Sequence, residues 1–169
     1  FDTNGKGNVM PKVLISYFSQ GGNTRKMAEA ISQAVEKAGC QTALKKISDT
    51  GLDDLENADG VLLGSPCYFG NMSAEMKRFL DESIALFGKG ALEGKPAGAF
   101  VSTGVIGGCG ELALMSLLAG LLIHGSVVQG TRKGGHLGPL AIGAPDERVL
   151  EECQRYGAQF AALVKRLSK

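Results

Sequence analysis

Residues 12–38 have the sequence KVLISYFSQGGNTRKMAEAISQAVEKA, and this stretch decides the class of fold. Lys12–Phe18 is a short apolar run that is rich in residues favouring β-strands. In Thr24–Ala38 the apolar residues recur at helical spacing, with charged residues on the opposite face. The loop SQGGNT lies between the two segments. The stretch therefore predicts a buried strand, a tight glycine loop and an amphipathic helix.

The same alternation repeats along the rest of the chain. Further strands are expected at Thr42–Ile47, Gly60–Ser65, Pro96–Ser102 and Ser126–Gln129, and further helices at Asp49–Ala58, Ser73–Leu86, Glu111–Ile123 and Asp146–Leu167. Residues 130–144 are expected to form a long glycine-rich loop. Near-continuous apolar strands separated by helices indicate a parallel sheet covered on both faces. We therefore predict an α/β doubly wound fold with five parallel strands in the order 2-1-3-4-5.

Length and composition predict one domain. The chain has 169 residues, enough for a full hydrophobic core. Residues 1–9 are polar and glycine-rich, so we expect a tag remnant or loose extension there and a domain over residues 10–169. The 25 glycines are about twice the usual share. Because they follow no collagen-like period, they are expected in loops that turn tightly or approach a ligand.

Charge, hydropathy and cysteine spacing exclude several classes of function. A net charge of +1 argues against a nucleic-acid binder that relies on a basic surface. The longest apolar run, Leu112–Ile123, is too short to span a membrane. The four cysteines form no CxxC pair, which argues against a zinc site or a disulfide framework. Free thiols in a cytoplasmic protein are the expected state.

Parallel sheets of this kind bind ligands at the carboxyl ends of their strands, which directs attention to three loops. The first, Ser19–Thr24, places hydroxyl groups and two glycines at a helix N-terminus, where backbone N–H groups and the helix dipole favour an anion. The alternative is a simple turn capped by Asn23. The chain has no GxGxxG fingerprint and no Walker sequence, which argues against a dinucleotide site and a nucleotide triphosphate loop.

The second and third loops point to a flat ring. Residues 65–72 contain the adjacent aromatics Tyr68 and Phe69, which are suited to stacking on a ring, unless they merely cover the core and a helix end. Residues 102–110 contain four glycines and two hydroxyl side chains, which suit a ligand that touches backbone better than a simple flexible connection. A phosphate loop with two ring-contacting loops predicts FMN as the ligand.

The chain resembles the flavodoxin-like superfamily, and within it the WrbA-type NAD(P)H:quinone oxidoreductases and related FMN reductases. The similarity covers residues 11–167. Its most specific part is residues 64–81, GSPCYFGNMSAEMKRFLD, which resembles that group's pattern G-x-P-x-x-x-G-N-M-x-x-x-x-x-x-F-x-D. The sequences Ser102-Thr103-Gly104 and His124-Gly125 also match. The chain departs from the group in a short connection over residues 47–60 and in Cys67 and Tyr68, where Thr and Arg are common.

The resemblance implies FMN as cofactor, NAD(P)H and quinones as substrates, and a homodimer or homotetramer. The FMN-binding residues predicted from the loops and the resemblance are Ser19, Gly21, Gly22, Asn23, Thr24, Pro66, Cys67, Tyr68, Phe69, Gly70, Asn71, Ser102, Thr103, Gly104, Gly107 and Gly108. His124 is implied to lie near the open face of the flavin as the catalytic residue, supplying a proton. The alternative is that His124 only caps the apolar helix before it.

Three functions are compatible with such a chain. The first is a two-electron reductase of quinones or similar acceptors, with the flavin carrying the chemistry. The second is a one-electron flavodoxin carrier; carriers of very low potential usually surround the flavin with acidic residues, whereas the third loop here is followed by one acid, Glu111. The third is a redox sensor, suggested by Cys67 and Cys109. The neutral charge favours the reductase.

Overall fold

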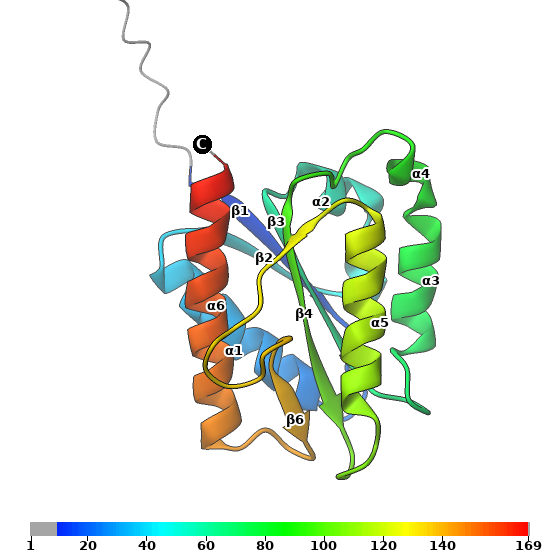
Figure 1. The fold of residues 1–169 in the computed structure, drawn as a ribbon, viewed down its shortest axis with the longest axis vertical. Coiled ribbons are helices and arrows are strands. Elements are labelled where there is room, and N and C mark those ends of the chain that lie inside the picture. The colour runs from blue at the N-terminus through cyan, green and yellow to red at the C-terminus, as the bar shows by residue number, and fades with distance from the viewer. Residues whose placement is uncertain (1–9, 169) are drawn as a thin grey trace, which may run out of the picture.

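The computed structural model describes residues 10–168 as strands alternating with helices (Figure 1). The predicted extension over residues 1–9 lies outside the described residues. The strands are β1 (Lys12–Tyr17), β2 (Gln41–Lys46), β3 (Gly60–Pro66), β4 (Pro96–Thr103), β5 (Val127–Val128) and β6 (Leu140–Ile142). The helices are α1 (Asn23–Lys37), α2 (Leu52–Asn57), α3 (Ala74–Glu82), α4 (Ile84–Phe87), α5 (Gly110–Ile123) and α6 (Glu147–Leu167), with a 3-10 turn at Ile47–Asp49. None of the described helices is long and apolar enough to cross a membrane.

The sheet has the predicted order β2-β1-β3-β4-β5, and neighbouring strands are parallel. β1, β3 and β4 form its centre and are buried almost throughout, which explains their continuous apolar sequences. β2 is an edge strand and alternates between partly buried and exposed residues. The predicted doubly wound fold is therefore confirmed.

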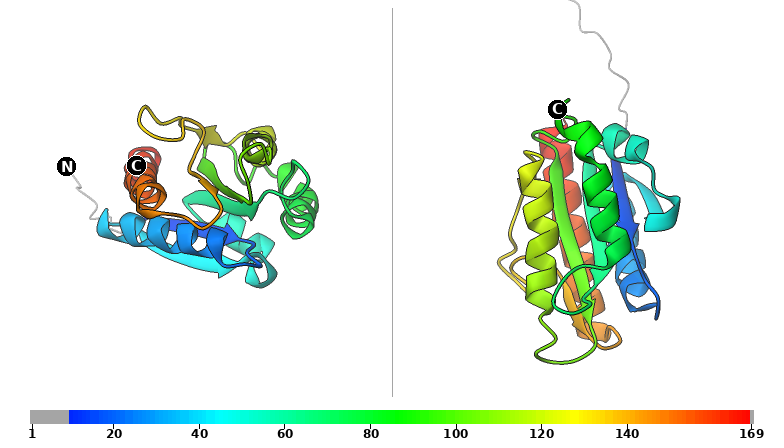
Figure 2. Two further views of the ribbon diagram at one scale, coloured as in Figure 1. Left: turned by 90° about the horizontal axis from the view of Figure 1, so that it is seen from below. Right: turned by 90° about the vertical axis from the view of Figure 1, so that its right-hand side faces the viewer.

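Helices cover both faces of the sheet (Figure 2). α1 and α6 pack against one face, where Val13, Ile15 and Phe100 belong to the same buried cluster as the apolar stripes of both helices. α3 and α5 cover the other face, where Leu14 and Leu63 contact the second cluster. Because side chains of a strand alternate between faces, β1 contributes to both clusters.

The region after α5 contains a strand that the sequence analysis assigned to a loop. β6 pairs in parallel with the carboxyl half of β4, at Val101–Thr103, whereas β5 pairs with the amino half, at Pro96–Ala97. The two short strands thus lie beside the same central strand, one after the other. β6 has only three residues and is bounded by Pro139 and Gly143, so its sequence carries no strand periodicity.

The helix predicted over residues 73–86 is divided into α3 and α4. The break lies at Ser83, whose hydroxyl donates to the carbonyl oxygen of Leu80 at 2.6 Å. A side chain that binds the preceding turn in this way competes with regular helix geometry. The apolar spacing continues through the break, so the sequence pattern did not reveal it.

Candidate functional site

Three loops at the carboxyl edge of the sheet surround one small cavity of about 170 Å³. In Figure 1 this edge is at the bottom of the molecule, where β1, β3 and β4 end. The cavity is lined by Ser19, Gln20, Gly21, Asn23, Thr24, Pro66, Cys67, Tyr68, Ser102, Thr103 and Gly104. Ten of these eleven residues belong to the set predicted from sequence. The structure therefore brings together residues that lie as far as 85 positions apart in the chain.

The first loop is held by its own serine. Gly22 adopts a left-handed backbone with φ +87°, which favours glycine at this position. The Ser19 hydroxyl accepts hydrogen bonds from the backbone N–H groups of Gly22 and Arg25, at 3.1 and 3.3 Å. The alternative of a turn capped by Asn23 is therefore wrong: Gly22 is the N-cap residue, and the Ser19 hydroxyl binds an N–H group of the first turn. Asn23 and Thr24 begin the helix, so their N–H groups have no acceptor within it.

Two buried hydroxyl groups form the floor of the cavity. Thr24 Oγ1 lies 2.9 Å from Ser102 Oγ, and both side chains are buried. This contact joins the start of α1 to the end of β4. It presents two hydroxyl groups to one space without adding charge, and no residue that lines the cavity is acidic or basic.

The second loop exposes its aromatic rings. Tyr68 and Asn71 are bridged by backbone hydrogen bonds, and Phe69 lies between them with φ +50° and a fully exposed side chain. The Tyr68 hydroxyl donates to the Gln20 side chain at 3.2 Å, and its ring lies edge-on to Phe18. The alternative that Phe69 covers the core is therefore wrong, because its ring is fully exposed to solvent.

Gln20 is a member of the site that the sequence analysis missed. Its side chain contacts Tyr68 from across the cavity, although the two residues are 48 positions apart. Its position between Ser19 and Gly21, within a loop already assigned to the ligand, was the available signal.

The third loop exposes apolar side chains to solvent. Val105 and Ile106 are exposed, and Gly107 has a left-handed backbone with φ +79°. A side chain on Gly108 would overlap the hydroxyl of Thr103, so this position requires glycine. Phe69, Gly70, Asn71, Gly107 and Gly108 do not line the small cavity itself, but lie in the loops that border it.

Cys67 connects the second loop to the third. Its thiol donates to the carbonyl oxygen of Gly108 at 3.0 Å, and its Sγ lies 3.4 Å from the carbonyl oxygen of Cys109. Burial raises the pKa of the Cys67 thiol above its usual value. The half-buried side chain thus lines the cavity as a neutral group.

The structure places His124 far from the three loops of its own chain. This residue ends α5, whereas the third loop precedes α5, and 14 helical residues separate the two by about 21 Å. His124 therefore lies at the amino edge of the sheet, away from the three loops of its own chain. Its Nε2 lies 2.8 Å from the Ser83 hydroxyl, and its ring is edge-on to Phe87.

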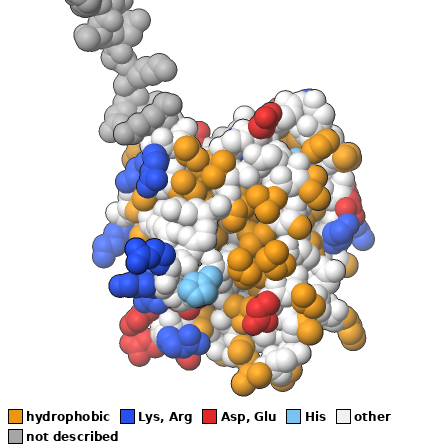
Figure 3. Space-filling view, in the orientation of Figure 1, with side chains coloured by type: hydrophobic (Ala, Val, Ile, Leu, Met, Phe, Trp, Pro, Cys, Tyr) orange, Lys and Arg blue, Asp and Glu red, His pale blue; other side chains and the backbone are white. Residues whose placement is uncertain are grey.

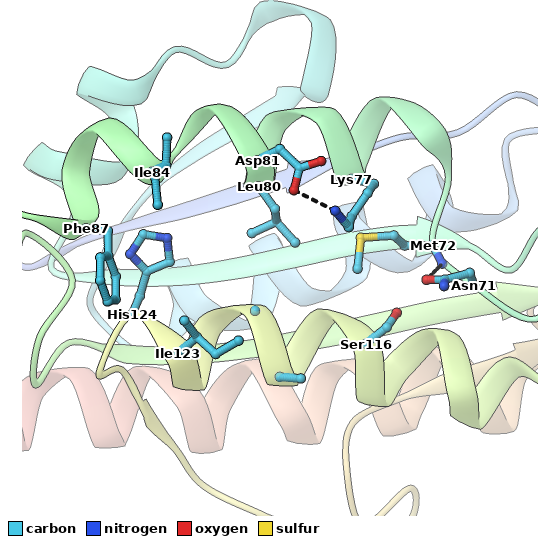
Figure 4. A pocket seen from close by; sticks show the side chains of 12 residues that line it. Asn71, Met72, Lys77, Leu80, Asp81, Ile84, Phe87, Ser116, Ile123 and His124 are labelled. Atoms are coloured by element: carbon cyan, nitrogen blue, oxygen red, sulfur yellow. Dashed lines mark hydrogen bonds and ion pairs between the residues drawn. The ribbon is translucent and has the colours of Figure 1, made fainter.

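His124 lies at one end of an apolar groove of about 410 Å³ between α3–α4 and α5, which we call the α3–α5 groove (Figure 4). The groove is lined by Asn71, Met72, Lys77, Leu80, Asp81, Ile84, Phe87, Ser116, Ala119, Gly120, Ile123 and His124. Burial lowers the pKa of His124, and its Nδ1 is buried without a hydrogen-bond partner among the described residues. His124 occupies the C-cap position of α5, as in the alternative interpretation, but burial favours its neutral form, so it adds no positive charge at this end of the helix dipole.

Comparison with known proteins gives the family. The flavodoxin domain profile matches residues 14–106, more than half of the chain. The chain belongs to the flavodoxin family. A flavodoxin of Aquifex aeolicus is 38% identical over 164 residues, which cover 92% of this chain and 88% of that protein.

Other relatives carry the names of enzymes. A protein of Rhodopseudomonas palustris strain HaA2, named NAD(P)H dehydrogenase (quinone), is 34% identical over 160 residues, which cover 80% of each chain. Among solved structures, a WrbA-like flavodoxin from Agrobacterium tumefaciens superposes with a TM-score of 0.81 at 26% identity, covering 93% of this chain and 99% of that one. The resemblance found from the sequence motifs is thereby confirmed.

Proposed function

We propose that this flavodoxin-family chain binds FMN in the three-loop cavity and acts as an NAD(P)H:quinone oxidoreductase. The observation that carries the proposal is the convergence of the three loops on one uncharged cavity at the carboxyl edge of the sheet. In doubly wound folds this edge is where ligands bind. The predicted residues of all three loops keep their proposed role as FMN contacts; His124 does not.

The first loop has the donors that a phosphate group needs. The N–H groups of Asn23 and Thr24 open a 15-residue helix, whose dipole favours an anion at this end. The hydroxyls of Thr24 and Ser102 are hydrogen-bonded to each other, so one of them donates to the other and the second keeps its proton as a further donor from the cavity floor. A phosphate monoester bound there is held by neutral donors and needs no lysine or arginine.

The second and third loops have the surfaces that a flat ring needs. Phe69, Val105 and Ile106 are exposed apolar side chains on the loops that border the cavity. Exposing such groups in water is unfavourable, and a planar aromatic ring placed between the loops would cover them. Gly107 has no side chain, so a ring heteroatom can approach its backbone N–H group closely.

FMN, when bound, would supply the chemistry of accepting two electrons from NAD(P)H and delivering them to a quinone. The chain's own residues bind and orient the cofactor. None of the residues that line the cavity is charged, so the lining itself adds no carboxylate next to the cofactor. This neutral surrounding favours the reductase over a carrier of very low potential, and the relatives named NAD(P)H dehydrogenase (quinone) support the same choice.

Oxidation of NADH and NADPH, followed with a panel of quinones and with FMN added or withheld, tests this function. We expect quinone-dependent oxidation of at least one nicotinamide, and we expect it to require FMN. Thr24→Val should reduce the rate at limiting FMN. A chain that binds FMN but oxidises neither nicotinamide would contradict the reductase and support the flavodoxin carrier, the name of the Aquifex aeolicus relative.

We also propose that the chain forms a homodimer or homotetramer through an apolar face of α5. Hydrophobic side chains gather over and beside this helix (Figure 3). The large exposed ones on α5 and α4 are Leu112, Met115, Leu122, Ile123, Ile84 and Phe87. They expose on the order of 600 Å² of apolar surface, at the upper end for a monomer and near the share of one partner in a standard interface. After Glu111, α5 has no charged residue, which suits contact with a second copy.

Sedimentation of the full chain tests the assembly. The wild-type chain should sediment as a dimer or tetramer, and Ile123→Arg should shift it toward the monomer. Leu167→Arg is the matched control, because Leu167 is an exposed apolar residue on α6. A wild-type chain that sediments as a monomer at micromolar concentration would contradict the proposed interface.

A further inference from the structure

Two thiols lie on the two loops that are proposed to flank the flavin ring. Cys67 follows β3 and Cys109 immediately precedes α5, 42 residues later. The sulfur of Cys67 lies 3.4 Å from the carbonyl oxygen of Cys109 itself and 3.0 Å from that of Gly108. The Cys109 sulfur lies 3.7 Å from the carbonyl oxygen of Gly107. Both sulfur atoms therefore lie against the same short turn.

The side chain of Cys109 faces the loop that contains Cys67. A Cβ atom built on Gly70 would lie 3.6 Å from the Cβ of Cys109. The Cys109 side chain therefore lies directly against the second loop, at a residue three positions after Cys67.

Cys109 also occupies a backbone conformation that is unfavourable for cysteine. Its φ of +59° is left-handed, a region that residues other than glycine rarely adopt because the Cβ atom clashes with the backbone. The neighbouring Gly107, Gly108 and Gly110 show that this loop otherwise uses glycine freely. A thiol at a position suited to glycine indicates that the side chain itself has a use.

The other two cysteines provide an internal comparison. Cys40 and Cys153 are buried between the sheet and the helices α1 and α6, and their exposed fractions are 1% and 0%. Burial raises the pKa of Cys153 to about 12, which leaves it protonated and unreactive. Cys109, in contrast, is exposed, and Cys67 is only half-buried.

We propose that Cys67 and Cys109 form a dithiol that hydroperoxides oxidise to an intramolecular disulfide, joining the two ring-facing loops. The pairing rests on the contacts between the two loops. Its effect on the cofactor rests, in addition, on the proposed function, since the disulfide would hold the loops together across the FMN site.

The chemistry uses one peroxide molecule per disulfide. The exposed Cys109 thiolate attacks a peroxide oxygen, the O–O bond breaks, and Cys109 becomes a sulfenic acid while hydroxide leaves. The Cys67 thiol then attacks the Cys109 sulfur, the S–O bond breaks, and a second hydroxide leaves with the released proton. In total, two thiols and one hydrogen peroxide yield one disulfide and two water molecules.

Mild oxidation of the full chain with hydrogen peroxide, with and without FMN, tests the pairing. Thiol titration in denaturant should fall from four free cysteines to two, and dithiothreitol should restore all four. Peptide mass spectrometry without reduction should find the Cys67 and Cys109 peptides linked, with two hydrogen atoms lost. Cys109→Ser should abolish the link, whereas Cys40→Ser should retain it.

The effect on the cofactor is measured as the rate of FMN release from oxidised and reduced protein. We expect release to slow several-fold after oxidation, and Cys109→Ser treated in the same way to show no slowing. Oxidation of Cys109 to sulfinic acid while Cys67 stays free, or a disulfide only between chains, would overturn the dithiol. Equal release rates would overturn the link to the cofactor. A chain that forms the disulfide but binds no FMN would instead overturn the proposed function.

Discussion

The two ends of α5 differ in how their polar and aromatic groups are used. At its start, the three loops present hydroxyl groups and helix N–H groups to a shared cavity, and an exposed phenylalanine lies on one of the loops that border it. At its end, His124 is engaged by Ser83 and Phe87, so the histidine completes the packing between α5 and α4. Groups available to a ligand lie at the carboxyl edge of the sheet, and groups engaged with one another lie at the amino edge.

This contrast follows from the direction of the strands. In a parallel sheet all carboxyl ends lie at one edge, so loops that follow different strands converge there. The helix that leaves this edge returns the chain to the opposite one. A residue that follows a helix in sequence is therefore far from the residues that precede it, whatever its chemical suitability.

The largest difference in FMN affinity is expected when one buried hydroxyl group is removed at each edge of the sheet. Thr24→Val removes a proposed phosphate donor, and loss of a hydrogen bond to a charged group costs about 1.5–3 kcal/mol, or roughly ten- to hundred-fold in FMN affinity. Ser126→Ala removes a buried hydroxyl at the amino edge, where Ser126 donates to Leu92, and should leave FMN affinity unchanged. Fluorescence titration measures both; equal affinities would show that the phosphate does not lie at α1.

A smaller difference in FMN affinity is expected when one phenylalanine is replaced by alanine at each edge. Phe69→Ala removes a proposed ring contact, worth about 0.5–1.5 kcal/mol, or roughly two- to ten-fold in FMN affinity. Because Phe69 is fully exposed, thermal stability should not change. Phe87→Ala, at the amino edge, should show the reverse pattern of lower stability and unchanged FMN affinity. If Phe69→Ala unfolds the chain more readily, its ring packs on the protein.

The smallest effect is expected from the pH dependence of stability. Burial lowers the pKa of His124 in the folded state, so below its ordinary pKa of about 6.5 the unfolded chain binds the proton more readily. The free energy of unfolding should therefore decline as pH falls from 6.5 toward the lower folded-state pKa. The slope corresponds to less than one proton taken up on unfolding.

Replacement of His124 by glutamine tests this slope. Chemical unfolding of His124→Gln at several pH values should show a flatter dependence over this window, with FMN affinity at neutral pH unchanged. An unaltered slope would show that the ring is not buried in its neutral form. Loss of FMN affinity would show that His124 reaches a flavin after all.

Much of the fold and most of the site were predictable from sequence. The apolar strands at Lys12–Phe18 and Gly60–Ser65 marked the sheet, and the loops after them marked the cavity, because both signals are local. β6 and the break at Ser83 were not predictable: a three-residue strand has no periodicity, and the break interrupts a pattern that continues through it.

His124 and the cysteine pair show how topology decides what local signals cannot. His124 was assigned to the flavin by resemblance, without allowing for the length of the helix that carries it to the amino edge. Cys67 and Cys109 are separated by 42 residues, so their spacing alone suggested nothing. Each lies in a loop at the carboxyl edge, and that shared edge is what brings them together.

A crystal structure of the chain grown with FMN tests the central claim most directly. We expect flavin density between the three loops at the carboxyl edge, with phosphate oxygens within hydrogen-bond distance of the N–H groups that open α1 and of the Thr24 hydroxyl. Density for FMN in the α3–α5 groove beside His124, with the three-loop cavity containing only water, would contradict it.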